Sequence, residues 1–81
     1  MKVNIRVMGY DTPHAKEAEL SLQEGDAVRD ALAEYLRLYD IGISLSEIAT
    51  SQFLVNGKAC GQKQVLLDGD RLTVLRLLGG G

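Results

Sequence analysis

Alternating apolar and polar positions predict strands at the start of the chain. From Lys2 to Met8 every second residue is Val or Ile, and the residues between them are polar or charged. A period of two is that of a strand with one buried face. The alternation returns from Ala18 to Leu22, after the turn-forming residues 9–13. The two segments therefore predict an antiparallel hairpin.

Helical spacing replaces this alternation in the middle of the chain. The apolar positions that show it are Val28, Leu32, Tyr35, Leu36 and Tyr39. They predict a helix from Ala27 to Tyr39, with Asp26 placed to cap the free amides of its first turn. Residues 40–51 are less regular and are expected to form a loop, although Ser44 and Glu47 have the spacing of a capping box for one helical turn.

Two turn signals organise the last third of the chain. A short strand, Phe53 to Val55, stops at Asn56-Gly57, the pair that most favours a type I′ turn, so residues 58–60 should return antiparallel. Residues 68–70 read Asp-Gly-Asp and predict a second tight turn. The alternation after it predicts a last strand from Arg71 to Leu78.

The order of elements predicts the fold class. Strand, strand, helix, strand, strand, strand is typical of an α+β domain. A hairpin, a crossover helix and a later strand beside the first give a β-grasp (ubiquitin-like) mixed sheet, covered on one face by the helix, with the first and last strands parallel at its centre. Both strands are among the most apolar segments, as burial requires. We expect a single domain over residues 1–81.

Size and charge argue against several classes of function. A domain near 81 residues buries only about 60% of its unfolded surface, which leaves little room for an enclosed substrate pocket and argues against an enzyme. The net charge of −2, with scattered Lys and Arg, makes nucleic acid a poor candidate. One Cys and one His cannot form an internal disulfide or a four-ligand zinc site.

Hydropathy and cysteine content bear on location. No apolar run approaches the roughly 20 residues needed to span a bilayer. The first residues lead directly into a strand pattern and not into the apolar block of a signal peptide. With a single Cys60, these features predict a cytoplasmic protein that does not contact membranes.

The last strand runs straight into Gly79-Gly80-Gly81, and this tail is the most informative feature of the chain. Three extended glycines reach roughly 10 Å. Because they lack side chains, they can enter a slot too narrow for other residues. We therefore expect a carboxylate at Gly81 to be delivered into the active site of a partner.

The faces of the last strand suggest how such a partner would be held. Leu72 and Val74 share one face, and Leu75 and Leu77 share the other. If the first pair packs on the helix, the second pair lies on the open face beside the tail, where it would form an apolar docking surface. Surplus surface leucines without a function are the alternative interpretation.

These motifs together resemble a known family. Val55-Asn56-Gly57, then Leu67-Asp68-Gly69-Asp70, then an alternating strand that ends in Gly80-Gly81 resembles the ThiS/MoaD family of ubiquitin-like sulfur carriers. The end of the chain, residues 78–81, is also similar to the tail of ubiquitin. The resemblance covers the whole chain in element order and is sharpest in the last third and at the helix start, residues 24–28.

The resemblance implies a specific chemistry at the tail. The carboxylate of Gly81, with Gly80 and Gly79 inside the enzyme, would be adenylated by a ubiquitin-activating-type adenylyltransferase that uses ATP and Mg. It would then become a thiocarboxylate that donates sulfur to a synthase subunit in molybdopterin-type or thiamine-type cofactor biosynthesis. The family's docking patch corresponds to Leu66 and Leu75, with Leu77 on the same face as Leu75. The chain itself would bind no cofactor or metal.

Alternatives stay open at this stage. The chain lacks the aromatic-rich segment followed by Arg that is typical of many molybdopterin-synthase small subunits, and residues 40–51 make it longer than compact thiamine-type carriers. The pathway is therefore undecided. Two other functions are compatible with the sequence: a protein modifier joined to lysines through Gly81, and a β-grasp interaction module without terminal chemistry.

The remaining side chains that could take part in chemistry are expected to have structural roles or to be solvated. Cys60 lacks an activating neighbour in sequence and is expected to pack, and His14 is expected in a solvated loop. Tyr35 and Tyr39 are expected in the core with their hydroxyls at its rim. Three acidic residues are expected to form a solvated face or to steer a basic partner: Glu17, Glu19 and Glu24.

Overall fold

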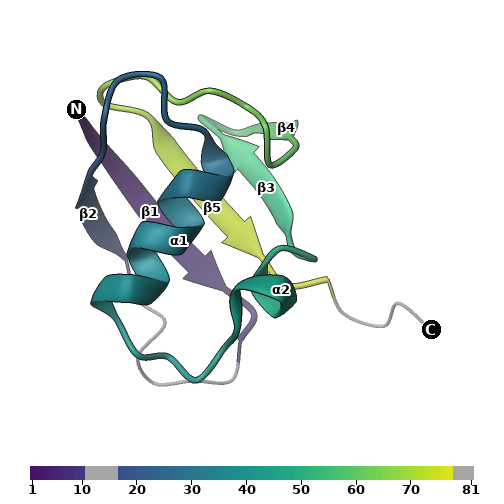
Figure 1. Cartoon of the computed structure of the whole chain (residues 1–81). Helices are drawn as coiled ribbons and strands as arrows, with labels where there is room; N and C mark the ends of the chain where they lie inside the picture. Colours follow the sequence, from purple (N-terminus) through teal and green to yellow (C-terminus); the bar gives the residue numbers. More distant parts are fainter. Residues whose placement is uncertain (11–16, 78–81) are drawn as a thin grey trace.

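The computed structural model describes residues 1–10 and 17–77, which form a mixed sheet with a helix across one face (Figure 1). The strands are β1 (Lys2–Met8), β2 (Ala18–Ser21), β3 (Gln52–Val55), β4 (Lys58–Cys60) and β5 (Arg71–Leu75), and the helices are α1 (Val28–Leu38) and α2 (Leu45–Ile48). This is the α+β, β-grasp arrangement expected from the sequence.

The five strands lie in the order β2-β1-β5-β3-β4. β1 and β5 are parallel neighbours, with Ile5 opposite Leu72 and Val7 opposite Val74, and the other pairs are antiparallel. The predicted parallel centre is therefore confirmed. No helix within residues 1–10 and 17–77 is long and apolar enough to cross a membrane.

The core lies between α1 and the central strands. α1 buries Val28, Ala31, Leu32 and Tyr35. The sheet buries the alternating residues of β1 and β5 against them, including Ile5 and Leu72. Each fully buried Val, Leu or Ile contributes about 1.5–3 kcal/mol relative to an exposed one, so this interface makes a large contribution to stability.

The start of α1 differs from the prediction. The N-cap is Ala27, whose amide donates to the Asp30 carboxylate at 2.8 Å. Asp26 does not cap the helix, because its carboxylate accepts from the amide of Gln23 at 2.9 Å in the preceding turn. The backbone bridge between Ala27 and Val65 fixes where the helix begins. The helix also ends one residue early, at Leu38.

The expected loop over 40–51 contains a helical turn, α2. Ser44 accepts at its hydroxyl from the amide of Glu47 at 3.2 Å, so the capping signal was correct and the loop prediction was wrong over Leu45–Ile48. Ile48 is fully buried and anchors the turn in the core. An exposed turn so short depends on such an anchor, because isolated short helices are marginal in water.

The end of β5 differs from the sequence prediction, and the Asn56-Gly57 turn agrees with it. β5 ends at Leu75 and not at Leu78, which lies outside the described residues. Asn56 and Gly57 have φ values of 52° and 83°, as a type I′ turn requires. The first predicted turn falls largely in residues 11–16, also outside the described part.

The side chain of Asn56 joins the turn between β3 and β4 to the turn that precedes β5. Its amide group donates to the Asp70 carboxylate and its oxygen accepts from the amide of Arg71, both at 2.9 Å. The Asn-Gly hairpin and the Asp-Gly-Asp turn are thus fixed to each other at the start of the last strand.

We predict that Asn56→Ala lowers the free energy of unfolding by about 1–2 kcal/mol, because two hydrogen bonds of about 0.5–1.5 kcal/mol each are lost. For a domain of this size, the midpoint of thermal unfolding should fall by about 4–8 °C per kcal/mol. Lys58→Ala, an exposed change across the same turn, is the control. Equal melting temperatures for the two variants would contradict the role of Asn56.

Candidate functional site: the open face and the root of the tail

The face of the sheet opposite α1, called the open face here, carries the outward side chains of the central strands. Leu72 and Val74 are buried against the helix, whereas Thr73 and Leu75 point outward and are partly exposed. The predicted assignment of the two faces of the last strand is therefore correct. Leu75 lies where it was expected.

Apolar residues lie on the open face near the end of β5, where the chain leaves the sheet. Figure 1 shows the position of this strand end. Met8 is the register partner of Leu75, and it is 43% exposed. Leu77 follows two residues later and is 60% exposed. We call Met8, Leu75 and Leu77 the apolar end. Met8 and Leu75 are neighbours across β1 and β5, and Leu77 and Leu78 follow along the chain before the glycines. Met8 is a member that sequence reasoning missed.

Leu66 does not belong to this surface. It is only 1% exposed and packs in the core cluster with α1 and the sheet. Its amide donates to the carbonyl of Asp26 at 2.9 Å, which holds the segment against the start of α1 and turns the side chain inward. The expectation that Leu66 docks a partner was therefore wrong, because its side chain is not at the surface.

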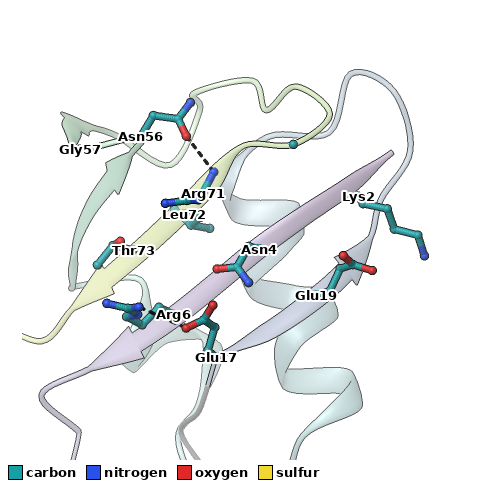
Figure 2. Close-up of a pocket in the computed structure, with 11 residues that line it drawn as sticks. Lys2, Asn4, Arg6, Glu17, Glu19, Asn56, Gly57, Arg71, Leu72 and Thr73 are labelled. Carbon is teal, nitrogen blue, oxygen red and sulfur yellow. Dashed lines mark hydrogen bonds and ion pairs between the residues drawn. The ribbon is translucent and has the colours of Figure 1, made fainter.

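The rest of the open face is polar and slightly hollowed. Figure 2 shows side chains from three strands on this face, including Asn4 and Thr73 in its middle. Arg6 and Glu17 point toward one another and form an ion pair at 3.2 Å. Hydrogen bonds from Arg6 and then Asn4 lower the pKa of Glu17, and the positive charge of Arg6 adds to this effect.

This polar part mixes both signs of charge. Glu17 and Glu19 line the same hollow as Lys2, Arg6 and Arg71. They are not an isolated acidic face, because cations from β1 and β5 lie among them. The Arg6–Glu17 pair is about half exposed, and such pairs contribute little to stability.

The root of the tail is held by contacts that the sequence did not reveal. Arg76 donates its amide to the carbonyl of Met8 at 3.0 Å. Its guanidinium carbon lies 5.4 Å from the centre of the Tyr10 ring, and the hydroxyl of Tyr10 is hydrogen-bonded to that of Ser51. Gly79, Gly80 and Gly81 lie outside the described residues.

The two tyrosines near the end of α1, His14 and the possible metal ligands were the other candidates. Tyr35 is buried in the core as expected, but the prediction for Tyr39 was wrong, because Tyr39 is exposed and is not part of the core. Their ring centres are 5.1 Å apart in a tilted arrangement at the end of α1. His14 lies outside the described residues. Within residues 1–10 and 17–77, no three His, Cys, Asp or Glu side chains are grouped so that they could hold a metal ion.

Cys60 lies in β4, opposite Phe53, and is half-buried against the core. Burial raises the pKa of its thiol, and a hydrogen bond with the backbone of Val55 offsets this only in part. A raised pKa reduces the fraction of thiolate, which is the nucleophilic form. The environment of Cys60 is therefore that of a packing residue.

We predict that Cys60 of the folded protein reacts with iodoacetamide more slowly at about pH 8 than the same residue in the chain unfolded in urea, because the folded thiol is less ionised. The Cys60→Ser variant should fold with a loss of about 1 kcal/mol. Mass spectrometry of quenched samples measures the rate. Faster reaction in the folded state would show that Cys60 is activated.

The structure was compared with known proteins. The sequence matches no protein-family model and has no significant match among curated proteins. SAMP1 (small archaeal modifier protein 1) of Haloferax volcanii superimposes with a TM-score of 0.81 at 16% identity over all of both chains. A putative molybdopterin converting factor, subunit 1, from Pyrococcus furiosus gives 0.72 at 23% identity over 95% of this chain and 98% of that one.

A third similar structure is the complex of subunits 1 and 2 of the molybdopterin-converting factor from Helicobacter pylori, with a TM-score of 0.59 at 18% identity over all of both chains. Proteins at such low identities share a fold without necessarily sharing a function. The chain therefore has the β-grasp fold that is common to MoaD-like subunits and ubiquitin-like archaeal modifiers.

Proposed function

We propose that this chain is a sulfur carrier of the ThiS/MoaD type, whose Gly81 carboxylate is activated and converted to a thiocarboxylate. The observation that carries the proposal is the position of β5. This central strand of a β-grasp sheet runs toward Gly79-Gly80-Gly81 and has an exposed apolar end at its point of departure.

The proposed chemistry needs an activating enzyme because a carboxylate is a poor electrophile. An oxygen of Gly81 attacks the α-phosphorus of ATP, pyrophosphate leaves, and an acyl-adenylate forms in a ubiquitin-activating-type adenylyltransferase that uses Mg. A sulfide-level donor then attacks the carbonyl carbon and AMP leaves. Both steps require a site that excludes water, and a side-chain-free tail fits such a site.

The apolar end is proposed to dock both this adenylyltransferase and a sulfur-accepting synthase subunit. Met8 and Leu77 are exposed and Leu75 is partly exposed in the free chain, so a partner can bury them without disturbing the core. The likeness to a subunit found in a two-subunit complex supports a synthase partner. A cytoplasmic location belongs to this proposal, since ATP and reduced Cys60 both suit that compartment.

A second function is a protein modifier, favoured by the likeness to SAMP1. A modifier shares the adenylation step, but the attacking group is finally a lysine amine and the product is an isopeptide bond. A third function, an interaction module without terminal chemistry, predicts that blocking the carboxylate changes nothing. The accepting pathway, molybdopterin-type or thiamine-type, is open in all cases.

The intact mass of the chain purified from its own cells separates these functions. A carrier shows a fraction in which one terminal oxygen is replaced by sulfur, a modifier shows adducts joined through Gly81 to lysines, and a module shows neither. The same spectrum reports whether the chain in the cell ends at Gly81.

We predict that deletion of Gly81 leaves thermal unfolding unchanged and abolishes ATP-dependent adenylate formation. The strand and core end before the glycines, so the deletion removes no described contact. Adding one residue after Gly81 should be as harmful, because it moves the carboxylate away from the reactive position. A shortened chain that is still adenylated at the wild-type rate would contradict the proposal.

We also predict that Leu75→Asp weakens partner binding at least tenfold while the domain stays folded. The new charge is wet in the free protein but unpaired in a desolvated contact, where losing an apolar anchor costs about 2 kcal/mol or more. Leu72→Asp is the matched control in the same strand. Its charge would face α1, so this variant should unfold.

Circular dichroism and titration calorimetry with the activating enzyme test this pair. An unfolded Leu75→Asp variant beside a native Leu72→Asp variant would reverse the two faces of the strand. A folded Leu75→Asp variant with wild-type affinity would remove the apolar end from the docking surface.

A further inference from the structure

We propose that Tyr10 is a positioning residue for the chemistry at Gly81, because it clasps Arg76 and thereby sets the direction in which the tail leaves the sheet. The clasp consists of Gly9, Tyr10, Ser51 and Arg76. Its effect on the reaction rests on the function proposed above, whereas its existence in the free protein is a separate claim.

The backbone part of the clasp extends the central pairing beyond the last residue of β5. The Arg76 amide donates to the carbonyl of Met8 at 3.0 Å. Gly9 follows with a φ of +85° and lies directly against Arg76. A Cβ added at Gly9 would lie 3.1 Å from the Arg76 Cβ and 3.4 Å from its amide nitrogen. A side chain at Gly9 would therefore push Arg76 away.

The side-chain part holds Arg76 from a second direction. Its guanidinium carbon is 5.4 Å from the centre of the Tyr10 ring, within the range of a cation–π contact. Tyr10 is half-buried and packs against the core, so the ring offers a fixed surface to a long side chain that would otherwise explore many rotamers.

Ser51 orients the Tyr10 ring. The two hydroxyls are hydrogen-bonded. Apart from Tyr35, Ser51 is the only buried polar residue among residues 1–10 and 17–77. Its own amide donates to the carbonyl of Ile48 at 3.1 Å, and Ile48 is fully buried. A continuous set of contacts therefore runs from the core through α2 to the root of the tail.

The clasp affects the tail because Arg76 directly precedes Leu77, the last residue of the apolar end, and the tail follows it. The four residues after Leu77 span at most about 13–14 Å when extended. A partner that grips the apolar end must receive Gly81 within that reach. Fixing Arg76 fixes the starting point and direction of this short segment, which increases the share of bound molecules with the carboxylate in place.

The free protein provides the first test, by NMR. The Tyr10 ring should shift the side-chain δ protons of Arg76 upfield, and the bond to Met8 should slow exchange of the Arg76 amide. Tyr10→Leu should abolish the shift and accelerate this exchange at least tenfold, whereas Tyr10→Phe keeps the ring and should keep most of the shift. Tyr39→Leu, a change at the exposed C-cap tyrosine of α1, is the control and should leave both signals unchanged.

The second test measures adenylation of each full-length chain by the activating enzyme. Tyr10→Leu should lower kcat at least tenfold with little change in KM, because the apolar end still docks, and Tyr10→Phe should restore most of the rate. Leu77→Asp should show the opposite pattern, a raised KM. Circular dichroism confirms that each variant is folded.

Two results would overturn the inference. The first is the absence of an upfield shift of the Arg76 δ protons in the wild-type protein, which would show that the clasp does not form. The other is a Tyr10→Leu variant that loses the shift but keeps the wild-type kcat, which leaves the clasp without a role in the reaction. Failure of the proposed function gives a different pattern: the wild-type chain itself is never adenylated, although its Arg76 signals are intact.

Discussion

The parallel pairing of β1 and β5 is the constraint on which the rest of this structure depends. Parallel neighbours cannot be joined by a tight turn, so α1 and the segments around it must cross one face of the sheet and cover both strands. The Asp-Gly-Asp turn then sets the register: Gly69 donates to the carbonyl of Lys2, and the Asp68 carboxylate accepts from the Lys2 amide, both at 2.7 Å.

This register decides which side chains of β5 a partner can reach. Residues two apart share a face, so a slip of one residue would bury Thr73 and Leu75 and expose Leu72 and Val74 to water. The cost of exposing two buried apolar side chains, about 1.5–3 kcal/mol each, opposes the slip. The apolar end is thus a consequence of core packing and of the turn that starts the strand.

Local patterns were sufficient to predict β1, the Asn56-Gly57 turn and the faces of β5, because each depends on residues near one another in the chain. They failed where a distant contact decides. Leu66 points inward because its amide bonds to the Asp26 carbonyl, and α1 begins directly after Ala27, which forms a bridge with Val65. The Tyr10–Arg76 contact joins residues 66 positions apart, so no local signal could reveal it.

The described part of this small domain has only open hollows, which suits the proposed carrier, since its reactive group would be treated by other proteins. Under this proposal, each enzyme would bind the domain while the same terminus is inside its own active site. The grip must therefore lie beside the tail and leave it free, as the apolar end does. An exposed apolar surface gives affinity but does not orient the bound domain, because apolar contact is not directional. The direction of the tail would then be set by the domain itself. In the described structure, the contacts around Arg76 are placed to set it.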